Sequence, residues 1–149
     1  MRNKRLIAVL LAGIALCFAA APVGAEPSIV LDQTAPRYGD AVTFTAAYPK
    51  EATRKVGRQQ MWNPAVQVDC YQFIDGATQH VFTANNAFVK DQHLASGDLT
   101  GVSGPIILGV LSNENTWTGG AASCVATLYY FGHDELIHVL AQTSFEVAA

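Results

Sequence analysis

Charged residues are scarce in this chain of 149 residues: they make up 14% of it, and the formal net charge is -3. Three of the nine basic residues, Arg2, Lys4 and Arg5, lie within the first 25 residues, which contain no acidic residue. The rest of the chain therefore carries six basic and all twelve acidic residues, a net charge of -6. So few basic residues in an acidic segment argue against nucleic acid as a partner.

The N-terminal segment has the three-part layout of a secretory signal peptide. Its basic start precedes the uncharged, largely apolar run Leu6–Ala21, then Pro22 and the small residues Val23–Gly24–Ala25. We expect cleavage after Ala25, which leaves one domain, residues 26–149, secreted or at the cell surface with no membrane span. The alternative is a retained anchor, because about 20 uncharged residues can just cross a bilayer.

Cysteine is also rare, and the three residues present form no CxxC motif and have no neighbouring histidine. That spacing argues against a thiolate metal site or a redox motif. Cys17 follows Leu16, where lipidation requires a small residue, so we do not expect a lipoprotein. Cys70 and Cys124 remain after cleavage, and in an oxidising compartment an even pair predicts a disulfide bond.

The residues after Ala25 show no amphipathic helical pattern, and their dominant hydrophobic period is two. Such alternation predicts short strands separated by turns rich in Gly, Pro, Asn and Asp. We place the turns at Pro36–Asp40, Asp75–Gly76, Ser96–Gly104, Ser112–Gly120 and Gly132–Glu135. The expected strands are Ile29–Leu31, Val42–Tyr48, Val66–Tyr71, His80–Phe88, Pro105–Leu111, Ser123–Phe131 and Ile137–Val147. In the last, Ile137, Val139, Ala141, Thr143, Phe145 and Val147 are expected to share one face. About seven such strands predict an all-β, two-sheet antiparallel sandwich.

Two segments resemble immunoglobulin-like β-sandwich domains of bacterial secreted or surface proteins and of tailed-phage structural proteins. Pro36–Thr45 is similar to the P-x-x-G-D-x-V-x-F start of their second strand, and Ala122–Tyr130 to their penultimate strand. Two features depart from the antibody pattern: Cys70 lies on the third expected strand, and Ala122 stands where a tyrosine corner belongs. The resemblance therefore implies a disulfide between neighbouring strands rather than between the two sheets.

Catalytic motifs are incomplete, so we expect no enzyme, cofactor or metal. His133–His138 looks like a zinc-protease motif, but the two histidines are five positions apart rather than four. The alternative of a small secreted metal-dependent hydrolase would require His133, Asp134 and His138 to converge. The segment Gly101–Pro105 has proline where a nucleophile elbow needs glycine.

Four of the six basic residues outside the N-terminal segment, Lys50, Arg54, Lys55 and Arg58, fall in one segment, Pro49–Pro64, which we expect to be a long irregular loop. With Trp62 it forms a possible contact surface for an unknown protein or an anionic cell-envelope polymer. The alternative is a solvated loop with Trp62 folded onto the core.

Trp117 lies among Asn and Thr residues and poses a similar choice. Exposed, it could serve as a sugar-stacking platform; buried, it would close the end of the core. We therefore expect a non-catalytic binding, adhesion or structural module. The alternative is a carbohydrate-binding module that uses Trp62 or Trp117.

Overall fold

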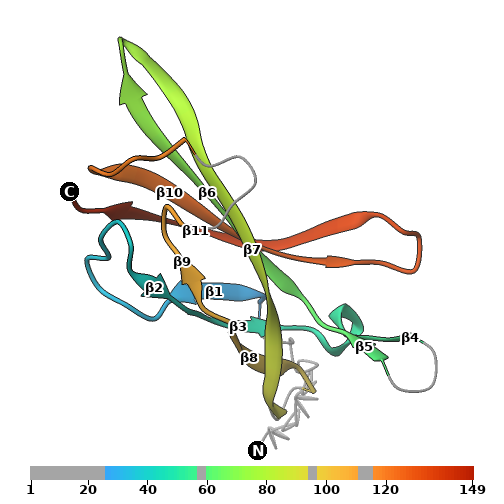
Figure 1. Ribbon diagram of the computed structural model, residues 1–149. Coiled ribbons are helices and arrows are strands. Elements are labelled where there is room, and N and C mark those ends of the chain that lie inside the picture. Colours follow the sequence, from blue (N-terminus) through green and yellow to red (C-terminus); the bar gives the residue numbers. More distant parts are fainter. Residues whose placement is uncertain (1–25, 57–59, 94–96, 111–115) are drawn as a thin grey trace, which may run out of the picture.

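The computed structural model describes residues 26–56, 60–93, 97–110 and 116–149 (Figure 1). The expected signal peptide, residues 1–25, lies outside these ranges and stays a prediction. For residues 54–56, 60–62 and 90–93 the description covers the backbone. The ordered elements are β1 (Ser28–Leu31), β2 (Ala41–Val42), β3 (Phe44–Tyr48), η1 (Lys50–Ala52), β4 (Arg54–Val56), β5 (Gln60–Trp62), β6 (Ala65–Ile74), β7 (Ala77–His93), β8 (Leu99–Ser103), β9 (Ile106–Ile107), β10 (Ala122–Phe131) and β11 (Ile137–Val147).

The main sheet has seven strands in the order β1-β3-β8-β7-β6-β10-β11, and all its strand pairs are antiparallel. Two small sheets, β2-β9 and β4-β5, accompany it. The all-β prediction is therefore confirmed.

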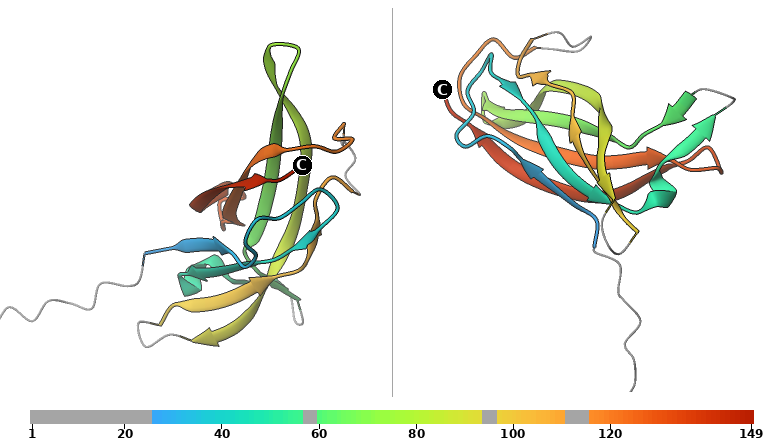
Figure 2. Two further views of the ribbon diagram at one scale, coloured as in Figure 1. Left: turned by 90° about the vertical axis from the view of Figure 1, so that its left-hand side faces the viewer. Right: turned by 90° about the horizontal axis from the view of Figure 1, so that it is seen from below.

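Strand β7 divides the sheet into two halves. Its first part, Ala77–Ala87, pairs with β6, and its last part, Phe88–His93, pairs with β8. Figure 2 shows the sheet folding over along this strand, and the edge strand β1 lies near β10 and β11 of the other half. The inner faces of the two halves thereby enclose one core. Its largest buried side chains are Trp117, Tyr48, Phe44, Phe82, Phe88, Leu108 and Leu128.

Strands β6 and β7 form a hairpin that projects beyond the rest of the sheet (Figure 1, green). Asp75 and Gly76 connect them with φ angles of 52° and 82°, as a two-residue turn with two left-handed positions requires. The turn predicted at Asp75–Gly76 is confirmed.

Strand β8 occupies a segment in which the sequence predicted a turn. Its residues Leu99, Gly101 and Ser103 are buried and face the core. A Cβ atom at Gly101 would lie 2.6 Å from the Val89 carbonyl oxygen and 2.7 Å from the Tyr48 hydroxyl, so this position requires glycine. The predicted strand Pro105–Leu111 is too long, because Ile106–Ile107 are the only strand residues within its described part, residues 105–110.

The expectation that Ile137 and Val139 share one face of β11 with Ala141, Thr143, Phe145 and Val147 is also wrong. The β10–β11 register shifts from Leu128↔Ala141 to Tyr129↔Val139, which leaves Leu140 as an extra residue. Beyond this bulge, Ile137 and Val139 are 60% and 58% exposed.

Candidate functional site

Cys70 of β6 and Cys124 of β10 form a disulfide, as the sequence predicted. The two residues are direct register partners in neighbouring strands, with their Cα atoms 4.1 Å apart. The bond therefore joins neighbours within one half of the sheet, as the resemblance implied. It lies at the base of the projecting β6–β7 hairpin, because the β6–β10 pairing ends one position further along, at Tyr71↔Ser123.

The basic segment Pro49–Pro64 is not the irregular loop that we expected. Its backbone forms η1 and then the antiparallel pair β4–β5, in which Arg54 lies opposite Trp62 and Lys55 opposite Met61. The length of this segment suggested a loop, but η1 and the β4–β5 pair account for much of it. Lys50 is exposed on η1. Arg58 lies outside the described residues, as do the side chains of Arg54, Lys55 and Trp62, so the contact surface remains a prediction.

Trp117 is buried at 2% exposure, so its proposed role as a sugar platform is wrong. The ring packs edge-on against Tyr38 and Phe82, with centroid distances of 5.2 and 6.0 Å. Its Nε1–H group donates to the carbonyl oxygen of Gly119 at 3.0 Å. A core site with a local acceptor satisfies both the ring and its polar atom.

The turn between β10 and β11 brings Asp134 and His138 together. His138 Nε2 lies 2.9 Å from Asp134 Oδ1, and the Leu136 N–H group donates to the same oxygen at 3.1 Å. Both hydrogen bonds hold the pKa of Asp134 below its ordinary value, and the bond with His138 has the larger effect. His133 does not join them. Within the described part of the chain, no three His, Cys, Asp or Glu side chains come close enough to hold a metal ion.

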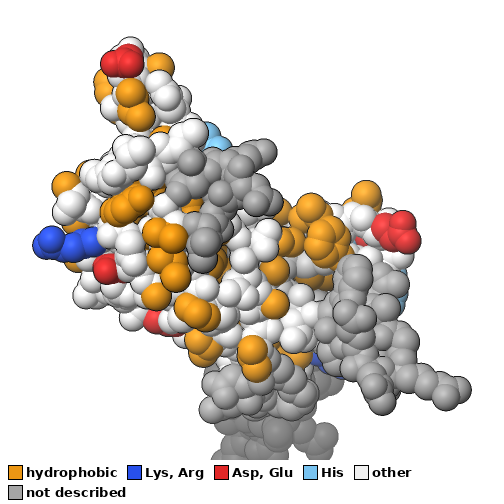
Figure 3. All heavy atoms as spheres, viewed as in Figure 1, with side chains coloured by type: hydrophobic (Ala, Val, Ile, Leu, Met, Phe, Trp, Pro, Cys, Tyr) orange, Lys and Arg blue, Asp and Glu red, His pale blue; other side chains and the backbone are white. Residues whose placement is uncertain are grey.

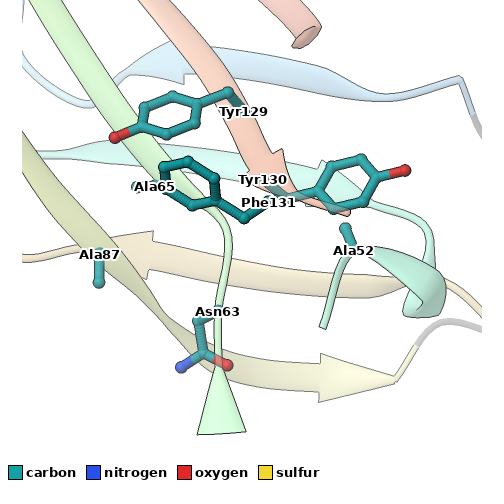
Figure 4. A pocket seen from close by; sticks show the side chains of 7 residues that line it. All are labelled: Ala52, Asn63, Ala65, Ala87, Tyr129, Tyr130 and Phe131. Atoms are coloured by element: carbon teal, nitrogen blue, oxygen red, sulfur yellow. The ribbon is translucent and has the colours of Figure 1, made fainter. Parts of the chain in front are cut away.

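A hollow of about 320 Å³ lies where β6 begins and β10 ends (Figure 4). Its floor contains the small residues Ala65 and Ala87, which are direct register partners on β6 and β7. Tyr129 and Phe131 form an aromatic wall, with ring centroids 5.9 Å apart, and partial burial raises the pKa of Tyr129. The remaining lining residues are Ala52, Asn63 and Tyr130.

The most exposed large apolar side chain among the described residues is Phe73, at 76%. It lies on β6 near the tip of the hairpin, beyond the last residue that pairs with β10. Figure 3 shows hydrophobic side chains gathered around an acidic one at this tip. Sequence reasoning missed Phe73, because nothing in the sequence states that β6 and β7 extend past their neighbours.

Comparison of the chain with protein-family models, curated proteins and solved structures finds no match. No helix in the described part of the chain is long and apolar enough to cross a membrane.

Proposed function

We propose that this protein is an exported, non-catalytic binding, adhesion or structural module of the cell envelope or extracellular space, with an immunoglobulin-like sandwich fold. The strand order supports the fold. Strands β1, β3, β8 and the second part of β7 correspond to A, B, E and D of such a sandwich, and β6, β10 and β11 to C, F and G. The first part of β7 would be the additional strand beside C.

The exposure of Phe73 is the observation that best supports a binding role. A two-stranded ribbon alone is marginally stable in water, and a large apolar side chain at its tip adds contact area that only a partner can bury. The disulfide and two hydrogen bonds hold the base of the ribbon, because Gln72 Nε2 donates to the carbonyl oxygens of Gly119 and Ala121, both at 2.9 Å. A preorganised apolar tip of this kind suits a contact element.

Export is supported by the basic start of residues 1–25 together with a disulfide, which persists in oxidising compartments. Intact mass spectrometry of the protein from its producing cells tests this part. We expect a chain that begins at Glu26 and gains two hydrogen masses on reduction. A mass that retains residues 1–25 would support the membrane-anchor alternative.

Affinity capture from envelope extracts tests the binding role. We expect the wild-type protein to recover a specific partner and Phe73→Ser to lose it. The control Val30→Ser also removes an exposed apolar side chain and should retain the partner. A second variant with Lys50, Arg54, Lys55 and Arg58 changed to Gln tests the basic segment separately. Equal recovery by all four proteins would contradict both contact surfaces.

A further inference from the structure

We propose that the β6–β7 hairpin of one copy docks, through Phe73, into the Ala65–Tyr129 hollow of a second copy. This inference rests on the proposed function and names the partner of its contact element. The hairpin tip and the hollow belong to the same strand, because β6 begins at the hollow with Ala65 and ends at the tip with Ile74.

The two sites cannot meet within one molecule. Ala65 and Phe73 lie on the outward side of β6, where the buried residues Val66, Val68 and Cys70 alternate with more exposed ones. At about 3.3 Å per residue they are separated by roughly 25 Å along a continuous strand. The hairpin of each copy therefore reaches only the hollow of another copy.

Size and chemistry match between tip and hollow. A cavity of about 150 Å³ accepts a benzene ring, so about 320 Å³ provides room for the Phe73 ring and part of its neighbour Ile74. The aromatic wall of Tyr129 and Phe131 offers edge-to-face packing to an incoming ring.

Charge orients the contact. Asp75 lies at the tip of the hairpin, and the exposed Lys50 begins the η1 turn that ends at Ala52 of the hollow. The acidic residue of this turn is Glu51. The β10–β11 turn, which follows Phe131 of the hollow, carries the exposed residues Asp134 and Glu135, and these repel Asp75. The incoming tip is therefore directed toward Lys50 of η1.

Docking of this kind allows copies of the protein to assemble into an open chain. A copy that inserts its hairpin leaves its own hollow vacant for a third copy, and such a head-to-tail contact builds chains unless a rotation closes them. Because the interface is small, its affinity is weak, and assembly requires high local concentration.

Sedimentation velocity of the purified protein between about 10 μM and about 1 mM tests the contact, a range suited to weak interfaces. We expect the mean mass to rise with concentration. Phe73→Ser and Ala87→Trp, which fills the hollow, should each weaken association by roughly 10- to 100-fold, and the surface control Val30→Ser should leave it unchanged. Far-UV circular dichroism and thermal midpoints verify that each variant is folded.

Mixing the two defective variants identifies the contact more sharply. Phe73→Ser retains a hollow and Ala87→Trp retains a hairpin, so an equimolar mixture should form a complex of one copy of each. Likewise, Asp75→Lys should weaken association, and adding Lys50→Glu in the same chain should restore it. A mixture that stays monomeric where the wild type associates would overturn the proposed contact.

A wild-type protein that stays monomeric throughout overturns the second copy as partner. The proposed function survives that result if Phe73→Ser still abolishes capture from envelope extracts. It fails together with this inference if Phe73→Ser changes neither association nor capture.

Discussion

Cys70 and Cys124 lie directly opposite each other in the β6–β10 register, with a Cα–Cα distance of 4.1 Å. The disulfide therefore reinforces two neighbouring strands at the level where the β6–β7 hairpin leaves the sheet. Stability and the geometry of the hairpin are linked through this bond.

Removal of the disulfide is expected to destabilise the protein and loosen the hairpin. The bond closes a loop with a sequence separation of 54, which corresponds to about 4 kcal/mol on the chain-entropy model. Replacing both cysteines with Ala should lower the free energy of unfolding in urea by about that amount. Amide exchange at Phe73–Thr78 should accelerate in the same variant. Unchanged exchange there would show that the bond does not hold the hairpin.

Tyr48→Phe is expected to stabilise the protein. The Tyr48 hydroxyl is buried and finds no hydrogen-bond partner among the described residues, and burial raises its pKa. Removing a buried, unpaired hydroxyl should raise the free energy of unfolding by about 1 kcal/mol. Tyr38→Phe is the matched control, because the Tyr38 hydroxyl lies 3.3 Å from the carbonyl oxygens of Gly109 and Trp117. That control should lose stability, and a loss in both variants would contradict this account of Tyr48.

Trp117 is expected to be shielded from solvent. In a Trp62→Phe variant the remaining fluorescence comes from Trp117, and acrylamide should quench it only weakly. Trp117→Ala should lower the free energy of unfolding by about 3–5 kcal/mol, because it opens a large cavity in the core. Efficient quenching together with a small loss of stability would instead favour an exposed sugar platform.

The pKa of Asp134 is expected to depend on His138. His138 Nε2 is hydrogen-bonded to the Asp134 carboxylate, and this bond favours the charged form. Because the folded-state pKa is lowered, the contribution to stability is present above the unfolded-state pKa and is lost as the pH falls through the folded-state value. Carbon-detected NMR titration should show the Asp134 pKa rising in His138→Ala. An identical pKa in both proteins would contradict the pairing.

The sequence predicted features that depend on short segments. Alternating hydrophobic residues predicted the bounds of β10 and β11 to within one residue. The Asp75–Gly76 pair predicted the hairpin turn, and the even number of cysteines predicted the disulfide. Features that depend on distant contacts were not predictable. Gly101 reads as a turn residue, and only its approach to Tyr48 and Val89 explains why glycine occupies a buried strand.

The candidate site was harder to predict than the fold. Sequence reasoning favoured Trp62, Trp117 and a basic segment, because these residue types often form contacts. The hollow depends on Ala65 and Ala87, which register brings together, and on aromatic residues of β10. The exposure of Phe73 depends on β6 extending past the end of β10. Small residues and unequal strand lengths carry no signal in the sequence pattern.

The central proposal is that the β6–β7 hairpin of one copy docks through Phe73 into the Ala65–Tyr129 hollow of a second copy. Concentration-dependent amide NMR spectra test it most directly. We expect shifts of Phe73–Asp75 at the tip to move together with those of Ala65, Ala87 and Phe131 at the hollow. Spectra independent of concentration, or shifts confined to the exposed residues Val30, Val89 and Val102 of the other half of the sheet, would contradict it.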